Sequence, residues 1–344
     1  MELNLSEANS SVPWDLEPQP AWSLGPENLV ALAAFGLIFT LGVLGNALVI
    51  VVLSRRRPGR PRGPTELFVL NLSVADLAYL LCCVPFQAVV YARPTWELGA
   101  FACKASHYVF TVSMLVSVFT LAAMAVDRYV AVVLARRAPG LRVARNALRG
   151  LGCIWALSLG MAAPVAAHQR LLHHQPGNLT FCWEQWPDPR HKKAYVLCTF
   201  LLGYLLPLTL ICFCYAKVLT HLHSNLKNMS KKSEASKKKT TQTVLVVVVV
   251  FGVSWLPHHV VHLWAEFGAF PLTPASFLLR VAAHCLAYSN SSVNPIIYAF
   301  LSENFRKAYR QVCSCPPHPR SPALDAKEAK SRLGTPPSTN CSHV

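Results

Sequence analysis

The sequence predicts an all-α membrane protein in which seven transmembrane helices form one bundle, followed by a short amphipathic helix. Composition is the first reason: 53% of the 344 residues are hydrophobic and only 14% are charged, whereas soluble domains average about 25% charged residues. The second is a series of seven apolar segments, each long enough for a helix to cross a bilayer. The third is the clustering of basic residues in alternate connections between these segments.

The apolar segments divide the chain into four regions. We expect an amino-terminal segment at 1–28, the helical bundle at 29–301, a helix on the membrane surface at 302–315 and a disordered tail at 316–344. The second, third and fifth segments are interrupted by single polar residues or prolines and not by loops. The seven segments lie at residues 29–53, 67–91, 104–134, 147–167, 195–220, 242–267 and 277–301.

Basic residues decide which side of the membrane each connection faces, since cytoplasmic loops are rich in lysine and arginine. Connections 54–65, 135–149 and 221–241 carry such clusters, and residues 1–28 contain no lysine or arginine. We therefore expect an extracellular amino terminus, a cytoplasmic carboxyl terminus and a location in the plasma membrane. The net charge of +16 follows from this asymmetry, so nucleic acid is not an expected partner, whereas anionic lipid is.

Residues on the outer side carry signals for covalent modification. Three glycosylation sequons fall there, at Asn4, Asn9 and Asn178. Cys103 and Cys182 lie where oxidation is permitted, and we predict that they form a disulfide; the alternative is two unpaired thiols.

The segment after residue 301, SENFRKAYRQVCSC, has apolar residues at helical spacing with basic residues between them. This pattern predicts an amphipathic helix on the inner leaflet. Cys313 and Cys315 end the segment, and we expect palmitoylation there.

Each apolar segment also contains polar or helix-breaking residues at characteristic places. The set is Asn46, Asp76, Asp127, Arg128, Tyr129, Trp155, Pro207, Tyr215, Trp255, Pro257, Asn294, Pro295 and Tyr298. In this order, and with the cysteine pair, these residues resemble the rhodopsin-like (class A) family of G-protein-coupled receptors over nearly the whole chain. The resemblance implies a receptor and not an enzyme, with a heterotrimeric G protein, arrestin and receptor kinases as partners.

Several of these residues suit a switch between two helix packings. Asp127 can neutralise Arg128 at the inner end of the third segment, and an arginine released from it must find another partner. Pro257 and Pro295 each remove a backbone hydrogen bond and kink their helices; the alternative is that the prolines only shape static packing. We assign the switch to Asp127, Arg128, Tyr129, Tyr215, Trp255, Pro257, Asn294, Pro295 and Tyr298.

A buried acid among hydroxyl and amide oxygens predicts a site for a hard cation. The resemblance implies an interior sodium site, and no other metal or cofactor is expected. The alternative is a hydrogen-bond network around a protonated aspartate. The residues that match the sodium site are Asp76, Ser117, Asn290, Ser291 and Asn294.

The stretch SWLPHHVVHLWAEF, residues 254–267, indicates where a ligand binds, because ionisable residues in a membrane span usually face a cavity. Trp255, His259, His262 and Glu266 fall within a narrow arc of one helix face, with His258 at its edge. Imidazoles and a carboxylate suit a ligand with hydroxyl, amide and amine groups. The expected set is completed by the aromatic walls Phe110 and Phe277 and the polar residues Arg280 and His284.

The ligand class is narrowed by two departures from other members of the family. Amine receptors carry an aspartate where this chain has Phe110, and opsins need a lysine that HCLAYSNSSVNP lacks. The stretches HHVVHLWAEFGAFPLTPASF and FCWEQWPDPRHKKAYV are similar to the galanin receptors. That resemblance implies the neuropeptide galanin as ligand, an inhibitory G protein of the i/o class and lowered cyclic AMP. It also implies that His259, His262, Glu266 and Phe277 bind the peptide.

Three alternatives stay open at this point. In the first, the ligand is another neuropeptide, such as spexin or kisspeptin. In the second, the protein is a transporter, although its halves show no internal repeat. In the third, the histidines only form hydrogen bonds to neighbouring helices.

Overall fold

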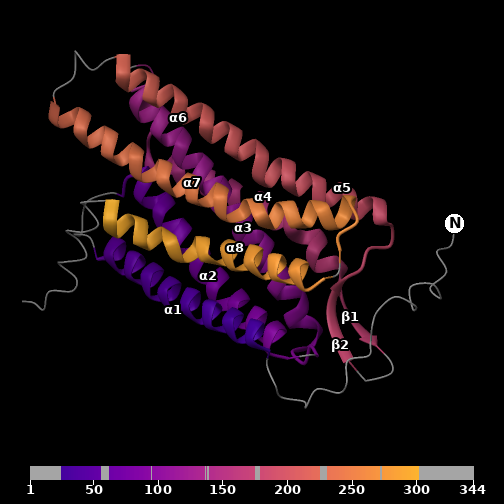
Figure 1. The fold of residues 1–344 in the computed structure, drawn as a ribbon. Helices are drawn as coiled ribbons and strands as arrows, with labels where there is room; N and C mark the ends of the chain where they lie inside the picture. Colours follow the sequence, from indigo (N-terminus) through magenta and orange to yellow (C-terminus); the bar gives the residue numbers. More distant parts are fainter. Residues whose placement is uncertain are drawn as a thin grey trace, which may run out of the picture.

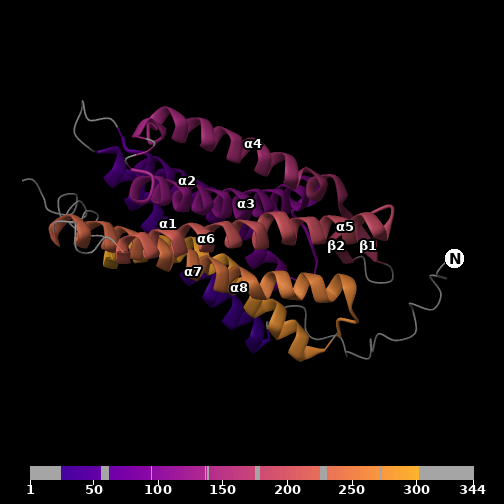
Figure 2. The ribbon, with the colours of Figure 1, turned by 90° about the horizontal axis from the view of Figure 1, so that it is seen from above.

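The computed structural model describes residues 25–55, 62–93, 95–135, 137, 139–174, 179–224, 231–271 and 273–301. Long helices run side by side in an elongated bundle, with a two-stranded hairpin at one end (Figure 1, Figure 2). The predicted all-α helical bundle is confirmed. The elements are α1 (Pro26–Ser54), α2 (Pro64–Ala92), α3 (Gly99–Val132), η1 (Pro139–Leu141), α4 (Ala144–His168), β1 (Gln169–His174), β2 (Leu179–Glu184), α5 (Pro189–Phe200), η2 (Leu201–Leu205), α6 (Leu206–Ser224), α7 (Lys231–Phe267) and α8 (Pro274–Leu301).

Seven rods make up the bundle, because α5, η2 and α6 continue one another and form the fifth. The segment η2 is a π-helix, in which the turn is wider than in an α-helix. Pro207 follows it directly. Proline cannot donate a backbone bond to the residue four positions earlier, and its ring clashes with that carbonyl in a regular α-helix. The wider turn around Gly203 therefore accommodates Pro207 within the rod.

The largest difference from the sequence expectation is the start of α7. The sequence predicts that the basic stretch SKKSEASKKKT belongs to a connection that ends at residue 241, but α7 begins at Lys231. Lysine, alanine and glutamate are good helix formers, so the helix continues through the polar stretch. The helix expected at 302–315 lies outside the described residues.

Within the part of the chain that the structure describes, six of the seven rods are long and apolar enough to cross a membrane. They are α1 to α4, the α5–α6 rod and the part of α7 from Val248 to Phe267. The helix α8 is not among them, because it carries Arg280, His284 and the polar run SNSSVN.

The core of the bundle surrounds α3, which packs against α2, α4, α6 and α7. Its largest cluster of buried side chains includes Leu72, Leu115, Met124, Ile211 and Phe251. Large apolar residues also cover the outside of the rods, as expected of a surface that faces lipid.

The first and last rods approach each other closely. A Cβ atom at Gly45 would lie only 2.8 Å from Cβ of Pro295, so glycine lets the two backbones meet. Asn46 donates to the carbonyl oxygens of Gly42 (2.9 Å) and Ser291 (2.8 Å), which joins α1 to α8. These contacts hold the polar part of α8 in the interior.

Candidate functional site

Trp255 and the three histidines of α7 lie close together on one side of the helix. Ring centroids are 5.6 Å apart for Trp255 and His258, and 4.5 Å apart for His258 and His262. His258, at the edge of the arc in the sequence, lies in the middle of the group, where its ring also contacts those of His259 (5.7 Å) and His284 (5.8 Å). We call His258, His259, His262 and His284 the histidine cluster.

Aromatic rings from α2, α3 and α8 pack beneath the histidine cluster. Phe110 lies 5.2 Å from His258 and 5.5 Å from Trp255, so it joins α3 to α7. Behind it, Tyr79 and Tyr288 stack with their centroids 4.9 Å apart. Together with Trp255 on α7, these rings form an aromatic floor that is drawn from four helices and packs against the imidazoles.

Two buried side chains of the site, His259 and Trp255, each have a polar atom without a hydrogen-bond partner among the described residues. His259 packs against Tyr204 (4.6 Å) and Phe200 (5.7 Å), yet its Nε2 atom has no hydrogen-bond partner among the described residues. The same holds for Nε1 of Trp255. Buried polar groups are normally satisfied, so these two atoms point to a partner such as a ligand or water. His262, which contacts His258, is the exposed member of the cluster.

The α8 side of the site is formed by His284, Phe277 and Arg280. His284 Nδ1 lies 3.2 Å from the hydroxyl of Tyr91, a residue on α2 that was not predicted. Phe277 is 41% exposed and meets the ring of Tyr91 edge-on, so much of its surface is free for a ligand. The Arg280 guanidinium packs over the ring of Phe270 at 5.3 Å.

Charged residues lie at the hairpin end of the bundle. Glu184 is on β2, Lys192 on α5, Glu266 on α7 and Arg280 on α8, and we call these four the charged rim. Glu266 is not a free carboxylate: its Oε2 accepts from Lys192 Nζ at 2.9 Å. Glu184 accepts from Trp186 Nε1 at 2.6 Å. With two acids and two bases, the rim has no net charge.

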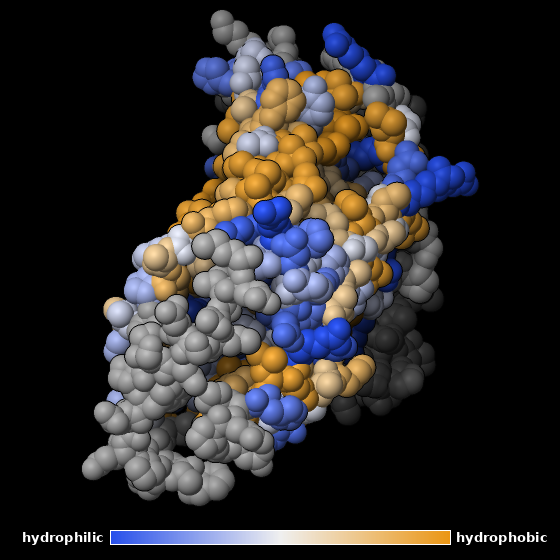
Figure 3. Space-filling view, turned by 90° about the vertical axis from the view of Figure 1, so that its right-hand side faces the viewer, coloured by the Kyte–Doolittle hydropathy of each residue, from blue (hydrophilic) through white to orange (hydrophobic). Residues whose placement is uncertain are grey.

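The hairpin end is anchored to the bundle through β2. Trp96 donates its backbone N–H to the carbonyl of Thr180 at 2.7 Å, and Thr180 donates to the Thr95 hydroxyl at 2.9 Å. Trp186 stacks on His168 with a centroid distance of 3.8 Å, which fixes the residues after β2 to the end of α4. Figure 3 views this end, where hydrophilic residues gather across the middle between hydrophobic ones.

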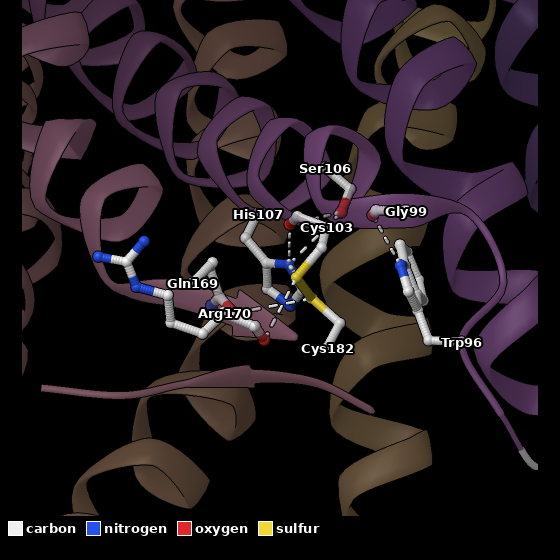
Figure 4. The surroundings of a disulfide bond; sticks show 8 residues. All are labelled: Trp96, Gly99, Cys103, Ser106, His107, Gln169, Arg170 and Cys182. Atoms are coloured by element: carbon white, nitrogen blue, oxygen red, sulfur yellow. Dashed lines mark hydrogen bonds between the residues drawn. A yellow bond between two sulfur atoms is a disulfide. The ribbon is translucent and has the colours of Figure 1, made fainter. Parts of the chain in front are cut away.

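Cys103 and Cys182 form a disulfide, as predicted, with their Cα atoms 5.6 Å apart. The bond ties β2 to the first turns of α3 (Figure 4). His107 lies beside it, with Nδ1 2.9 Å from the Cys103 carbonyl oxygen, and the Trp96 indole donates to Gly99 at 2.9 Å. The hairpin is therefore held at a fixed place over the bundle end.

A buried acid lies deeper in the bundle, between α2, α3 and α8. Asn294 donates to Asp76 Oδ2 at 2.9 Å. Oδ1 of Asp76 and Oδ1 of both Asn290 and Asn294 are buried without a hydrogen-bond partner among the described residues. Ser117 and Ser291, the other two residues predicted for this site, are also buried. Such unsatisfied oxygen atoms fit a hard cation.

The end opposite the hairpin holds a cluster of ion pairs. Arg128 donates to Asp127 Oδ2 at 2.7 Å, which is the predicted pairing. Arg142, in the connection before α4, donates to Asp127 Oδ1 at 2.8 Å. The Thr65 hydroxyl donates to Asp127 Oδ2 at 2.9 Å and accepts from both arginines.

The remaining predicted residues divide into two groups. Tyr129 and Pro257 are half-buried, whereas Tyr215 and Pro295 are buried. The side chain of Tyr298 and the modification sites Asn4, Asn9, Asn178, Cys313 and Cys315 lie outside the described residues.

The chain matches proteins of known family along most of its length. A family model described as 7 transmembrane receptor (rhodopsin family) matches residues 45–298. The chain belongs to this family of receptors. The receptor is 73% identical to galanin receptor type 1 of Homo sapiens, covering 100% of both chains, and 72% identical to that of Mus musculus, covering 99% of each. Galanin receptor type 2 of Rattus norvegicus is 42% identical, over 84% of this chain and 77% of that protein.

Family membership confirms the predicted resemblance and the expectation that the chain is a receptor and not an enzyme. Sequence reasoning missed the partners that fix the site residues, above all Tyr91, Glu184 and Lys192. Each lies on an element that is far along the chain from the residue it contacts. The charge of Lys192, near the start of α5, was visible in the sequence, but nothing there indicated that it pairs with Glu266.

Proposed function

We propose that this receptor binds the neuropeptide galanin at the hairpin end of its bundle and signals through G proteins of the i/o class, which lowers cyclic AMP. The observation that carries the proposal is 72–73% identity with galanin receptors type 1 over 99–100% of the chain. Because the match covers both chains almost completely, it includes the segments that carry the histidine cluster and the charged rim.

The chemistry of the site suits a peptide. A peptide backbone and its side chains offer hydrogen-bond donors and acceptors, which the free Nε2 of His259 and Nε1 of Trp255 can use. Phe110 supplies aromatic surface from α3 and Phe277 from α8. The neutral rim favours recognition by hydrogen bonds and apolar contact over attraction of a highly charged molecule.

The hairpin end is proposed to be extracellular, with the receptor in the plasma membrane. Two observations support this orientation. The disulfide lies at the hairpin end, and disulfides form on the oxidising side of a membrane. The opposite end carries Arg128, Arg142 and the basic first turns of α7, as expected of a cytoplasmic side.

Asp76, Ser117, Asn290, Ser291 and Asn294 would hold a sodium ion, for which the unsatisfied oxygens are suitable ligands. A bound cation would neutralise the Asp76 carboxylate and stabilise one packing of α2, α3 and α8. Ligand contacts near Trp255 then bias the receptor between this packing and one that engages the G protein. Arrestin and receptor kinases are the further partners that we propose for the active packing.

The test is competition against labelled galanin on cells that express the tagged receptor, with a cyclic AMP assay alongside. We expect saturable galanin binding, a fall in cyclic AMP, and weaker binding when Glu266→Ala replaces the parent at equal surface expression. Preferential displacement by spexin or kisspeptin would assign a different ligand. Solute uptake into receptor-containing vesicles without a G protein would overturn the receptor mechanism itself.

A further inference from the structure

Lys192 and Glu266 form an ion pair between α5 and α7 at the hairpin end. Their Nζ and Oε2 atoms are 2.9 Å apart, and the two side chains are 30% and 12% exposed. A carboxylate that is so little exposed needs a partner, because an unpaired charge in such a place is strongly destabilising. Lys192 therefore supplies the opposite charge beside Glu266 and holds the carboxylate through this contact.

The neighbouring residues on the same helices meet in a different way. The Lys193 ammonium lies 5.9 Å from the ring centroid of Phe267, which is a cation–π contact at an exposed position. Consecutive lysines of α5 thus meet consecutive residues of α7. Only the Lys192 contact involves two opposite charges, so the two lysines can be separated by experiment.

The ion pair also lies near His262, which is on the same helix as Glu266. Glu266 follows His262 by one helical turn, so a ligand that reaches the imidazole also meets the paired carboxylate. Loss of Lys192 would leave the charged rim with a net negative charge and Glu266 free to change its rotamer.

We infer that Lys192 is a positioning residue for ligand recognition: it holds Glu266 in place, and the two side chains act as one unit that joins α5 to α7. The inference rests on the proposed galanin site, and goes beyond it by assigning a role to a residue of the fifth rod. Its distinctive consequence is that the effects of changing Lys192 and Glu266 are not additive.

The experiment is a double-mutant cycle on the full-length tagged receptor, read as galanin affinity at measured surface expression. We expect Lys192→Met and Glu266→Gln each to weaken binding about tenfold, and the double variant to bind no more than about twofold worse than either. Lys192→Arg should retain binding, because a guanidinium also pairs with a carboxylate. Lys193→Met is the matched control and should bind like the parent.

Two results would overturn the inference: parental binding by Lys192→Met, or an equal loss from Lys192→Met in the parent and in the Glu266→Gln background. Lys192→Gln replaces Lys192→Met if the latter does not reach the surface. If the parent receptor binds no galanin, the proposed ligand is wrong, and the same cycle is measured as Tm of the purified receptor. Non-additive losses in Tm support the pair, and additive losses refute it.

Discussion

Arg142 shares the carboxylate of Asp127 with Arg128: it donates to Oδ1 at 2.8 Å, while Arg128 donates to Oδ2 at 2.7 Å. The Thr65 hydroxyl lies between the two guanidinium groups and bonds the same carboxylate. Asp127 is buried, so it needs these partners. The connection before α4 and the start of α2 are thus joined to α3 through one acid.

The first prediction concerns Arg142. Removing it leaves Asp127 with one arginine and loosens the contact between α3 and the next connection. We expect Arg142→Gln to raise signalling in the absence of ligand about threefold. This is the effect of shifting the free-energy difference between the two helix packings by under about 1 kcal/mol. G-protein activation in membranes without peptide measures this. Arg145→Gln, which changes an exposed arginine of α4, is the control, and equal basal signalling in both variants would refute the role.

The second prediction separates binding from signalling. Arg128 lies at the end of the bundle opposite the histidine cluster, so Arg128→Ala removes no group of the ligand site. We expect it to lower maximal G-protein activation at least tenfold while galanin affinity changes by less than about threefold. Both are measured at equal surface expression. Full activation by this variant would show that Arg128 has no part in the switch.

The third prediction uses the free nitrogen of His259. If a ligand supplies its partner, His259→Ala should weaken galanin binding about tenfold or more, the usual effect of losing a buried hydrogen bond. The matched control is His173→Ala on β1, where the exposed imidazole bonds the Thr180 side chain. Radioligand competition on intact cells distinguishes them. Equal affinities would place the ligand elsewhere.

The fourth prediction tests the oxygen-lined group around Asp76. We expect sodium chloride to lower agonist affinity of the parent about fivefold, compared with an organic cation at the same ionic strength. Asp76→Asn removes the negative charge that attracts the ion, and its affinity should not depend on sodium. Sodium-insensitive binding by the parent receptor would instead favour a hydrogen-bond network around a protonated Asp76.

The rods were predictable because hydrophobic length and periodicity are local properties. Six of the seven predicted segments lie wholly within helices, the third runs two residues past the end of α3, and only α7 differs by more than about two turns. Its first turns are polar, so a hydropathy reading cannot separate them from a loop although their residues favour a helix. The β1–β2 hairpin was not predicted for a different reason: it is held by the disulfide and by Trp96, which are tertiary contacts.

The residues of the candidate site were predictable only along one helix. Helical spacing brings Trp255, His259 and His262 to one face, and the structure shows them there. Contacts between elements could not be read in this way. Lys192 lies 74 positions before Glu266, and Tyr91 lies 193 positions before His284. Such pairs depend on how the rods pack, which one sequence does not specify residue by residue.

The early start of α7 has a mechanical consequence. At a rise of about 1.5 Å per residue, its 37 residues span about 55 Å, well beyond the roughly 30 Å of a bilayer's hydrocarbon core. Pro257 divides this rod unequally, with about 39 Å between it and Lys231. A tilt of about 10° at the proline would sweep the lysine-bearing tip through about 7 Å, so α7 is built as a lever arm with its fulcrum beside the imidazoles.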